Sequence, residues 1–295
     1  MTGRVIAITG GKGGVGKSTT TINLGVSLRL DGYSTVVVDA DVEMPNLMEM
    51  LGLEATSTIH DVLSGAADTS EALVQIGEGF AAIPGDPALS GYGSIEPERL
   101  NEVVEALATQ YDYVLLDTGA GLSYDDLFPI GLADEIVLVM SPDPAAVENA
   151  KRTYSFIQML NRTIRGIVLT KVEGEVDETI PAAFDTELLG AIPFDEVVSR
   201  STAAGKPIEL IAPDSPPAKA YRELESNLTD GRLPPSRLDL MPASDDAAAD
   251  ADESASGEAE PVEDAGEPPR AAEGETSDPS PKKPGLLRRI ASRVT

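Results

Sequence analysis

Short, continuous apolar runs alternate with longer amphipathic stretches over most of the chain. The apolar runs are rich in β-branched residues and predict buried strands at 4–9, 35–39, 80–83, 112–117, 135–140, 166–170 and 189–192. The amphipathic stretches predict helices, chiefly at 17–31, 97–110, 144–161 and 216–228. This alternation is typical of an α/β fold, in which a doubly wound, mostly parallel sheet is covered by helices on both faces.

The pattern ends abruptly near residue 240. Residues 243–281 consist mainly of Ala, Asp, Glu, Ser, Gly and Pro, with a single Arg and a single Val. Such a segment cannot bury enough apolar surface to offset the entropy of ordering, so we expect it to be disordered. We therefore predict a globular domain over 1–238, an acidic linker over 239–281 and a basic, partly apolar tip over 282–295.

Composition excludes several kinds of site. The chain of 295 residues has no cysteine, which excludes disulfides and Cys-ligated zinc or iron–sulfur centres. It has one histidine, His60, so a His-ligated metal site or a Cys/His nucleophile is excluded, and we expect His60 to be structural. The formal net charge of −28 disfavours nucleic acid as a partner, and the scarcity of lysine fits a salt-adapted source.

Nothing in the sequence predicts a membrane-spanning segment. The first apolar run leads into a glycine loop and not into a signal-peptide cleavage site. No run of about 18 apolar residues occurs, which is the length that a spanning helix needs. We therefore expect a cytoplasmic protein.

Glycines dominate the segment between the first predicted strand and the first predicted helix. Residues 10–19 read GGKGGVGKST, in which Gly11, Gly16, Lys17 and Ser18 satisfy the P-loop pattern G-x-x-x-x-G-K-[ST]. Glycines let the backbone curl so that several N–H groups point at phosphate oxygens, and the following helix presents its N-terminus to the anion. Lys17 should reach the β- and γ-phosphates, and the Ser18 hydroxyl should ligate Mg²⁺.

The position of this loop between a strand and a helix favours a P-loop over a glycine-rich turn that binds nothing. The predicted ligands are ATP and Mg²⁺. The predicted nucleotide-binding residues are Gly11, Lys12, Gly13, Gly14, Val15, Gly16, Lys17, Ser18 and Thr19.

Acidic residues follow two of the predicted strands, at the edge where open α/β sheets bind ligands. Asp39 and Asp41 stand at the end of strand 35–39, and Asp117 ends strand 112–117. An apolar strand that ends in Asp is the Walker B pattern, whose carboxylate belongs to the Mg²⁺ shell. The alternative for Asp41 is a helix N-cap.

The string KGGVGKST at 12–19 resembles the signature of the deviant Walker A ATPases, the MinD/ParA group. The resemblance covers about residues 1–230. It implies an ATP-dependent sandwich dimer in which Lys12 contacts the nucleotide of the partner subunit. It also implies that Asp39 lies near Mg²⁺, that Asp41 positions the attacking water and that Asn46 belongs to the same switch segment. Lys12, Lys17 and Asp41 are thus the predicted catalytic residues, and Ser18, Asp39 and Asp117 are the predicted metal-site residues.

The resemblance extends to base recognition and to the C-terminal tip. Thr170 stands where many relatives place an Asn that reads the adenine edge. On a helix that begins near Pro284, four aliphatic side chains fall on one face and arginines lie on the other. The predicted membrane-binding residues are Leu286, Leu287, Arg288, Arg289, Ile290, Arg293 and Val294.

The tip resembles the membrane-targeting tail of MinD proteins. The alternatives are a basic tail that folds onto its own acidic linker, one that recruits a protein partner, and one that does nothing.

Together these features predict a MinD-like ATPase that dimerises on ATP, associates reversibly with a membrane and hydrolyses ATP slowly to reset. Its role would be to position division, motility or other cargo, with a cell pole as one site and an unknown activator or cargo protein as partner. The alternatives are a ParA-like carrier that moves cargo over nucleic acid, and a nucleotide-dependent scaffold with negligible turnover.

Overall fold

The computed structural model of the chain describes residues 2–88, 92–121, 123–232 and 234. The predicted linker 239–281 and tip 282–295 therefore lie outside the described residues, as do the last four residues of the predicted domain. Among the described residues, no helix is long and apolar enough to cross a membrane.

The described strands form one sheet of eight in the order β3-β4-β2-β5-β1-β6-β7-β8. Every neighbouring pair is parallel except β3 with β4. The strands are β1 (Arg4–Thr9), β2 (Thr35–Asp39), β3 (Val74–Gly77), β4 (Phe80–Ile83), β5 (Tyr113–Asp117), β6 (Glu135–Met140), β7 (Ile164–Val172) and β8 (Leu188–Pro193). The order turns back on both sides of β1, which confirms the predicted doubly wound, mostly parallel sheet.

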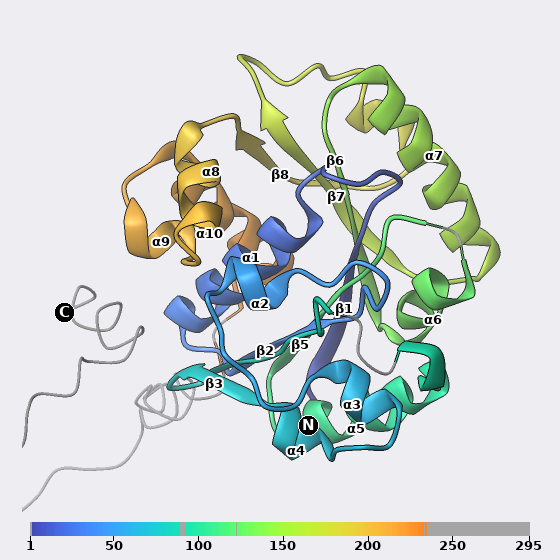
Figure 1. The fold of residues 1–295 in the computed structure, drawn as a ribbon. Coiled ribbons are helices and arrows are strands. Elements are labelled where there is room, and N and C mark those ends of the chain that lie inside the picture. Colours follow the sequence, from blue (N-terminus) through green and yellow to red (C-terminus); the bar gives the residue numbers. More distant parts are fainter. Residues whose placement is uncertain (1, 89–91, 122, 233, 235–295) are drawn as a thin grey trace, which may run out of the picture.

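Helices cover both faces of this sheet (Figure 1). One face carries α1 (Lys17–Asp31), α2 (Leu47–Met50), α8 (Glu196–Ala203), α9 (Ile208–Ile211) and α10 (Pro216–Thr229). The other carries α3 (Ile59–Leu63), α4 (Thr69–Ala72), α5 (Leu100–Ala108), α6 (Tyr124–Leu132) and α7 (Pro144–Met159). The 3₁₀ turns are η1 (Tyr92–Ser94), η2 (Pro97–Arg99) and η3 (Pro181–Ala183).

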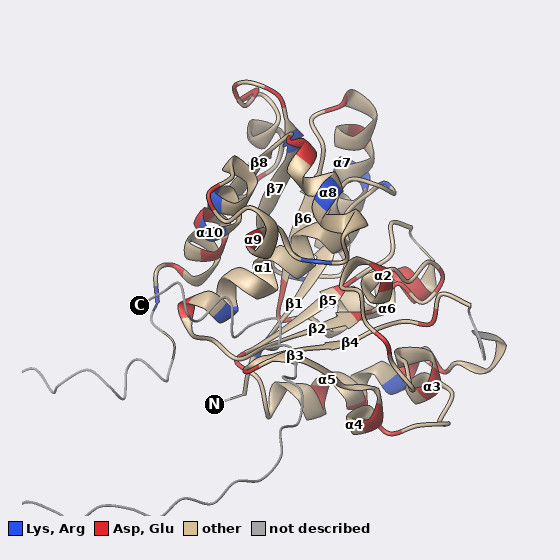
Figure 2. Cartoon of the chain, turned by 60° about the vertical axis from the view of Figure 1, so that its left-hand side comes forward, with Lys and Arg blue, Asp and Glu red and all other residues tan. Residues whose placement is uncertain are grey.

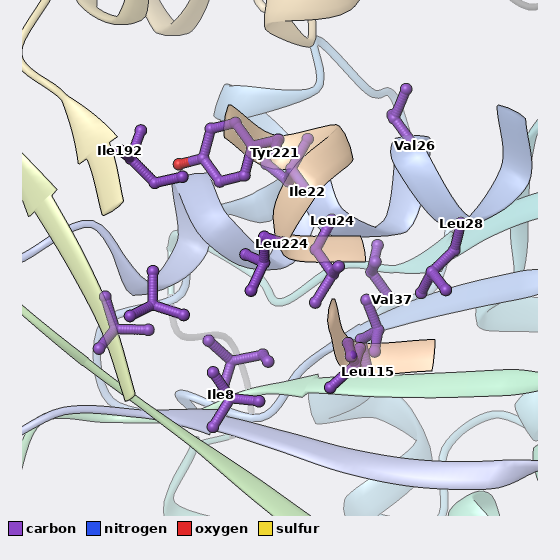
Figure 3. Close-up of a cluster of buried hydrophobic side chains, with 14 of the residues drawn as sticks. Ile8, Ile22, Leu24, Val26, Leu28, Val37, Leu115, Ile192, Tyr221 and Leu224 are labelled. Atoms are coloured by element: carbon purple, nitrogen blue, oxygen red, sulfur yellow. The ribbon is translucent and has the colours of Figure 1, made fainter. Parts of the chain in front are cut away.

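Side chains of the central strands alternate between the two layers, as the pleat requires. In β1, Ile6 and Ile8 pack with α1 and α10, whereas Val5 and Ala7 pack with α5 and α6. Helix α1 packs against the central strands on one side and against α10, which itself packs on β8, on another (Figure 3). Because α1 is buried on both sides, its N-terminus is held rigidly at the end of β1.

Several predicted boundaries shift, for local reasons. The predicted helix 97–110 opens with the 3₁₀ turn η2 and becomes α-helical only at Leu100. The predicted helix 144–161 ends at Met159, and two residues later Asn161 takes the left-handed conformation with φ of 53°. The structure also contains elements that were not predicted. They include the short antiparallel strand β3 at the sheet edge, α6, which contains Pro129, and the short helices α2, α4, α8 and α9.

Candidate nucleotide-binding site

The glycine-rich loop joins β1 to α1 at the carboxyl end of the sheet. Gly16 has φ of 99°, in the left-handed region that side chains disfavour, and it occupies the N-cap position of α1. A Cβ on Gly11 would clash with the backbone of Asn149 in α7. Since Gly16 has no side chain with which to cap α1, the amides of the first turn stay available to an anionic ligand.

Lys17 and Ser18 open α1 beside the end of β5. Lys17 keeps only 8% of its surface exposed, which a charged ammonium tolerates only with anionic neighbours. Both Lys17 and the Ser18 hydroxyl stabilise the ionised form of Asp117. The Thr21 hydroxyl donates to Asp117 Oδ1 at 3.2 Å. The first turn of α1 and the Walker B carboxylate thus form one polar cluster.

Asp39 and Asp117 are direct partners on the neighbouring strands β2 and β5, and both are fully buried. Asp39 Oδ2 accepts hydrogen bonds from the backbone N–H groups of Asn46, at 2.9 Å, and Leu47, at 3.0 Å. Asp39 therefore fixes the start of α2. We call residues 39–47 the switch segment, because it runs from this carboxylate along the site.

Three buried oxygens of this cluster have no hydrogen-bond partner: Asp39 Oδ1, Asp117 Oδ2 and Asn46 Oδ1. Burial, and then the neighbouring Asp117 carboxylate, raise the pKa of Asp39 well above its usual value. Burial raises the pKa of Asp117 to about 6, against the effects of the Ser18 hydroxyl and Lys17. Two buried carboxylates with spare oxygens suit a hard cation such as Mg²⁺, so the residues fit the predicted metal.

The described residues contain no group of three or more His, Cys, Asp or Glu side chains suited to a metal. A Mg²⁺ ion at this place would therefore also need ligands from the phosphates and from water, which is its usual habit in nucleotide sites.

Asp41 lies in the wall of the cleft, and its Oδ1 accepts the Met44 N–H at 3.0 Å. It does not cap a helix, because the next helix begins at Leu47. The turn after β5 lies beside Asp41: a Cβ on Gly119 would be 3.5 Å from Asp41 Oδ1 and would clash with Asp126. Asp126, which sequence reasoning missed, completes the capping box of α6 with Ser123.

Lys12 points away from this cleft. Its ammonium lies 3.4 Å from Asp143 Oδ1, and both side chains are nearly half exposed. The two residues line a separate cavity of about 540 Å³, together with Lys171 and Glu173. The Ser141 hydroxyl, the Ala146 N–H and Lys12 lower the pKa of Asp143, so this carboxyl group is ionised at neutral pH.

Thr170 and Lys171 support the glycine-rich loop from β7. The Thr170 hydroxyl lies 2.5 Å from the Val15 carbonyl oxygen and 3.3 Å from that of Met140. Lys171 has φ of 55° and donates from Nζ to the Gly14 carbonyl oxygen at 2.7 Å. The Thr170 hydroxyl therefore donates its hydrogen bond to the loop backbone. The residue also lines the cleft, where it was expected to contact the adenine base. No motif in the sequence predicted the hydrogen bond of Lys171 to Gly14.

The cleft has a volume of about 1050 Å³ and extends from the loop to α8. Its far wall is largely apolar and is lined by Ile192, Pro193, Phe194, Val198 and Tyr221. A pocket with phosphate-binding groups at one end and apolar side chains at the other suits a nucleotide.

Comparison with known proteins agrees with this geometry. The ParA family model, described as "NUBPL iron-transfer P-loop NTPase", matches residues 2–229. An uncharacterised ATP-binding protein of Methanocaldococcus jannaschii is 34% identical over 228 residues, which are 76% of this chain and 86% of that protein. A protein of Guillardia theta named for septum-site determination, MinD, is 33% identical over 76% of this chain and 88% of its own length. The chain belongs to the MinD/ParA family.

A solved structure supports the same assignment. The MinD protein of Pyrococcus horikoshii, complexed with Mg-ADP, superposes with a TM-score of 0.73 at 31% identity. The superposition covers 76% of this chain and 95% of that one. The MinD/ParA fold therefore accounts for nearly all of the described residues.

This MinD/ParA protein is an ATPase that uses ATP and Mg²⁺. The amides of 11–19 and the Lys17 ammonium would hold the phosphates, and Ser18, Asp39 and Asp117 would hold the metal. When bound, Mg²⁺ neutralises charge on the β- and γ-phosphates. The matching family model is named for iron transfer, but this sequence has no cysteine to supply thiolate ligands.

Proposed function

We propose that this MinD/ParA-family ATPase is a switch that dimerises on ATP, hydrolyses it slowly to reset, and positions cargo within the cell. The placement of Lys12 carries the proposal. Lys17 lines the cleft of its own subunit, whereas Lys12 faces an outward cavity beside Asp143. A half-exposed lysine at the rim of a phosphate site is placed to reach the nucleotide of a second copy, as an arginine finger does.

Asp41 would then orient the attacking water. Its carboxylate lies in the cleft wall and is held by the Met44 N–H, beside the glycine turn that follows the metal-site strand β5. Among the described residues, no lysine or arginine forms an ion pair with Asp41, so a subunit would turn over slowly until a partner completes the site. Slow turnover suits a switch, because the ATP state then persists long enough to act.

The dimer is tested by measuring mass in solution with light scattering. We expect Asp41→Ala with ATP to be dimeric and the same variant with ADP to be monomeric, because hydrolysis no longer resets it. Adding Lys12→Ala should restore the monomer, whereas Lys151→Ala, an exposed lysine on α7, should not. A protein that stays monomeric with ATP in every variant would reject the switch.

Membrane association is the second part of the proposal and rests on the sequence of the tip, 282–295. A helix that begins near Pro284 has at most 12 residues, which is the lower limit of the roughly 12–15 that an isolated helix needs to be stable in water, so a surface would have to order it. Each of its four aliphatic side chains contributes a few kcal/mol at most, and the cost of ordering the segment offsets much of that gain. Two tips on a dimer bind with avidity, so ATP would control a peripheral membrane location.

Co-sedimentation with anionic liposomes tests this part. The intact chain and a version that ends at Pro281 are each compared with ATP and with ADP, at low and high KCl. We expect only the intact chain with ATP to pellet. If neither version pellets, the tip does not bind membrane, and an ATP-dependent, salt-sensitive shift of DNA would then favour a carrier on nucleic acid.

A role in placement is supported by relatives that are named for septum-site determination. Which cargo this protein would place depends on its partners.

A further inference from the structure

The only histidine of the chain lies beneath the switch segment. His60 is fully buried on α3, which packs against the sheet face opposite α1. The start of α3 is held by a capping box, in which the Thr58 N–H donates to Asp61 Oδ2 at 2.8 Å. The Ile59 N–H donates to the Pro84 carbonyl oxygen at 2.9 Å. These bonds hold the start of α3, and with it the backbone of His60, in place.

The ring joins two loops that border the nucleotide site. His60 Nε2 lies 2.9 Å from the Val42 carbonyl oxygen, and the Asp86 N–H donates to His60 Nδ1 at 3.1 Å. A carbonyl oxygen only accepts and a backbone N–H only donates, so these partners assign the neutral tautomer with its proton on Nε2. Val42 follows Asp41 directly, and Asp86 belongs to the loop after β4.

The loop after β4 is packed against the switch segment as well. A Cβ on Gly85 would clash with the Pro45 side chain and would lie 3.4 Å from the Asp39 carboxyl carbon. The loop therefore lies between α3 and the two ends of the switch segment. The hydrogen bond to the Val42 carbonyl joins α3 directly to the switch segment. In sequence, Val42 lies between Asp39, a predicted metal-site residue, and Asn46.

We propose that His60 is a positioning residue for ATP hydrolysis, which holds the switch segment through the Val42 carbonyl and thereby sets where the Asp41 carboxylate stands. The ring does not line the cleft, so it takes no part in the chemistry. Its contribution is to remove freedom from a segment whose exposed part, at Met44, has 75% of its surface in solvent. The proposal rests on the proposed role of Asp41 in orienting the attacking water, and it does not depend on the membrane tip. Its effect on the order of the switch segment can be measured in the free protein, without turnover or a dimer.

A matched pair of substitutions separates this role from simple filling of the core. The amide of Gln lies at about the depth of Nε2, so His60→Gln can still donate to Val42. The amide of Asn lies at about the depth of Nδ1, so His60→Asn can accept from Asp86 but cannot reach Val42. Each variant keeps one hydrogen bond and loses the other, so their stabilities should be similar.

We expect His60→Gln to keep kcat within about twofold and His60→Asn to lose roughly five- to tenfold, the usual effect of one lost hydrogen bond. The KM for ATP should change by less than about twofold in both, since the glycine-rich loop is untouched. Equal losses in the two variants, or a loss that appears mainly in KM, would overturn the proposal.

A second readout needs no turnover. Hydrogen exchange of the free protein should show faster exchange of the Met44, Asn46 and Leu47 amides in His60→Asn than in His60→Gln. Exchange of the β1 amides should be equal in both, which controls for global unfolding. If the switch segment exchanges alike in the two variants, Val42 is not held by His60 in the way proposed.

Discussion

Two buried carboxylates, at the ends of β2 and β5, concentrate negative charge at the place where the metal ion is expected. Asp39 and Asp117 are partners across the two strands, and each keeps one oxygen without a hydrogen bond. Burial and mutual repulsion raise the pKa of Asp39, and burial raises that of Asp117 to about 6. The two buried carboxylates therefore repel each other, an electrostatic strain that a bound cation would relieve.

Replacing Asp117 by Asn should separate stability from function. In metal-free, nucleotide-free protein, Asp117→Asn should raise the free energy of unfolding by about 1–3 kcal/mol, because it removes one of two coupled buried charges. With ATP and Mg²⁺, turnover should fall by at least roughly 100-fold. Thermal unfolding and phosphate release measure the two effects, with exposed Glu102→Gln as the control. A lower melting temperature of Asp117→Asn would contradict the assignment of strain.

Thr170 provides a second test at one atom. Thr170→Val keeps the shape but removes the hydroxyl that bonds the buried Val15 carbonyl oxygen, so the glycine-rich loop should lose order. Titration calorimetry should show ATP affinity roughly five- to tenfold weaker. Thr170→Ser keeps the hydroxyl and should bind nearly as the parent does. Equal affinity in all three proteins would mean that this hydrogen bond does not shape the loop.

Among the secondary-structure elements, α2 connects the switch segment to the α8–α9 region. The connection runs through two glycines, since a Cβ on Gly205 would lie 2.9 Å from Gly52 Cα. Both residues have φ of 59°, in the left-handed region. The end of α2 therefore rests on backbone, and no side chain lies between the two segments.

Gly205→Ala should break this contact, and Gly174→Ala is its matched control. Both glycines have positive φ, but a Cβ on Gly174 would have open space around it. Both variants should therefore carry the same backbone strain, and Gly205→Ala should lose about 1–3 kcal/mol more from overpacking. Urea unfolding of the two variants measures the difference. Equal losses of unfolding free energy would show that the Gly52–Gly205 contact can adjust to an added methyl group without destabilising the protein.

Considered as a whole, the molecule carries far more negative than positive charge. Residues 1–238 hold 36 Asp and Glu and 16 Lys and Arg, a net charge of −20. Figure 2 shows the few Lys and Arg scattered among more frequent Asp and Glu. Two copies that approach each other must therefore overcome repulsion, which salt screens.

The proposed dimer should consequently strengthen with salt. For Asp41→Ala with ATP, we expect the dimer fraction to rise between about 50 mM and about 500 mM KCl, as the Debye length falls below the size of the interface. Light scattering measures the fraction. A version that ends at Leu238 has a net charge of −20, against −28 for the intact chain, and should respond less. A dimer that weakens with salt would indicate an interface dominated by ion pairs.

Local pattern is enough to predict most of the fold and the phosphate end of the site. The glycine-rich loop is contiguous in sequence, so the spacing of the P-loop pattern is enough to identify Gly11, Gly16, Lys17 and Ser18. Continuous apolar runs predict the parallel strands, because strands buried on both faces have no polar side. Asp39 and Asp117 follow from their place at strand ends, which parallel strands bring to one edge of the sheet.

Contacts between distant segments could not be predicted in this way. The hydrogen bond of Lys171 to Gly14 joins residues 157 positions apart, and that of His60 to Val42 joins residues 18 positions apart on different elements. The position of Asp126 beside Gly119 depends on how α6 packs after the turn that follows β5. No periodicity encodes such pairs, because they depend on how loops settle after the sheet has formed. Sequence pattern thus identifies the groups proposed to bind phosphate and metal, and packing determines how the switch segment is held beside them.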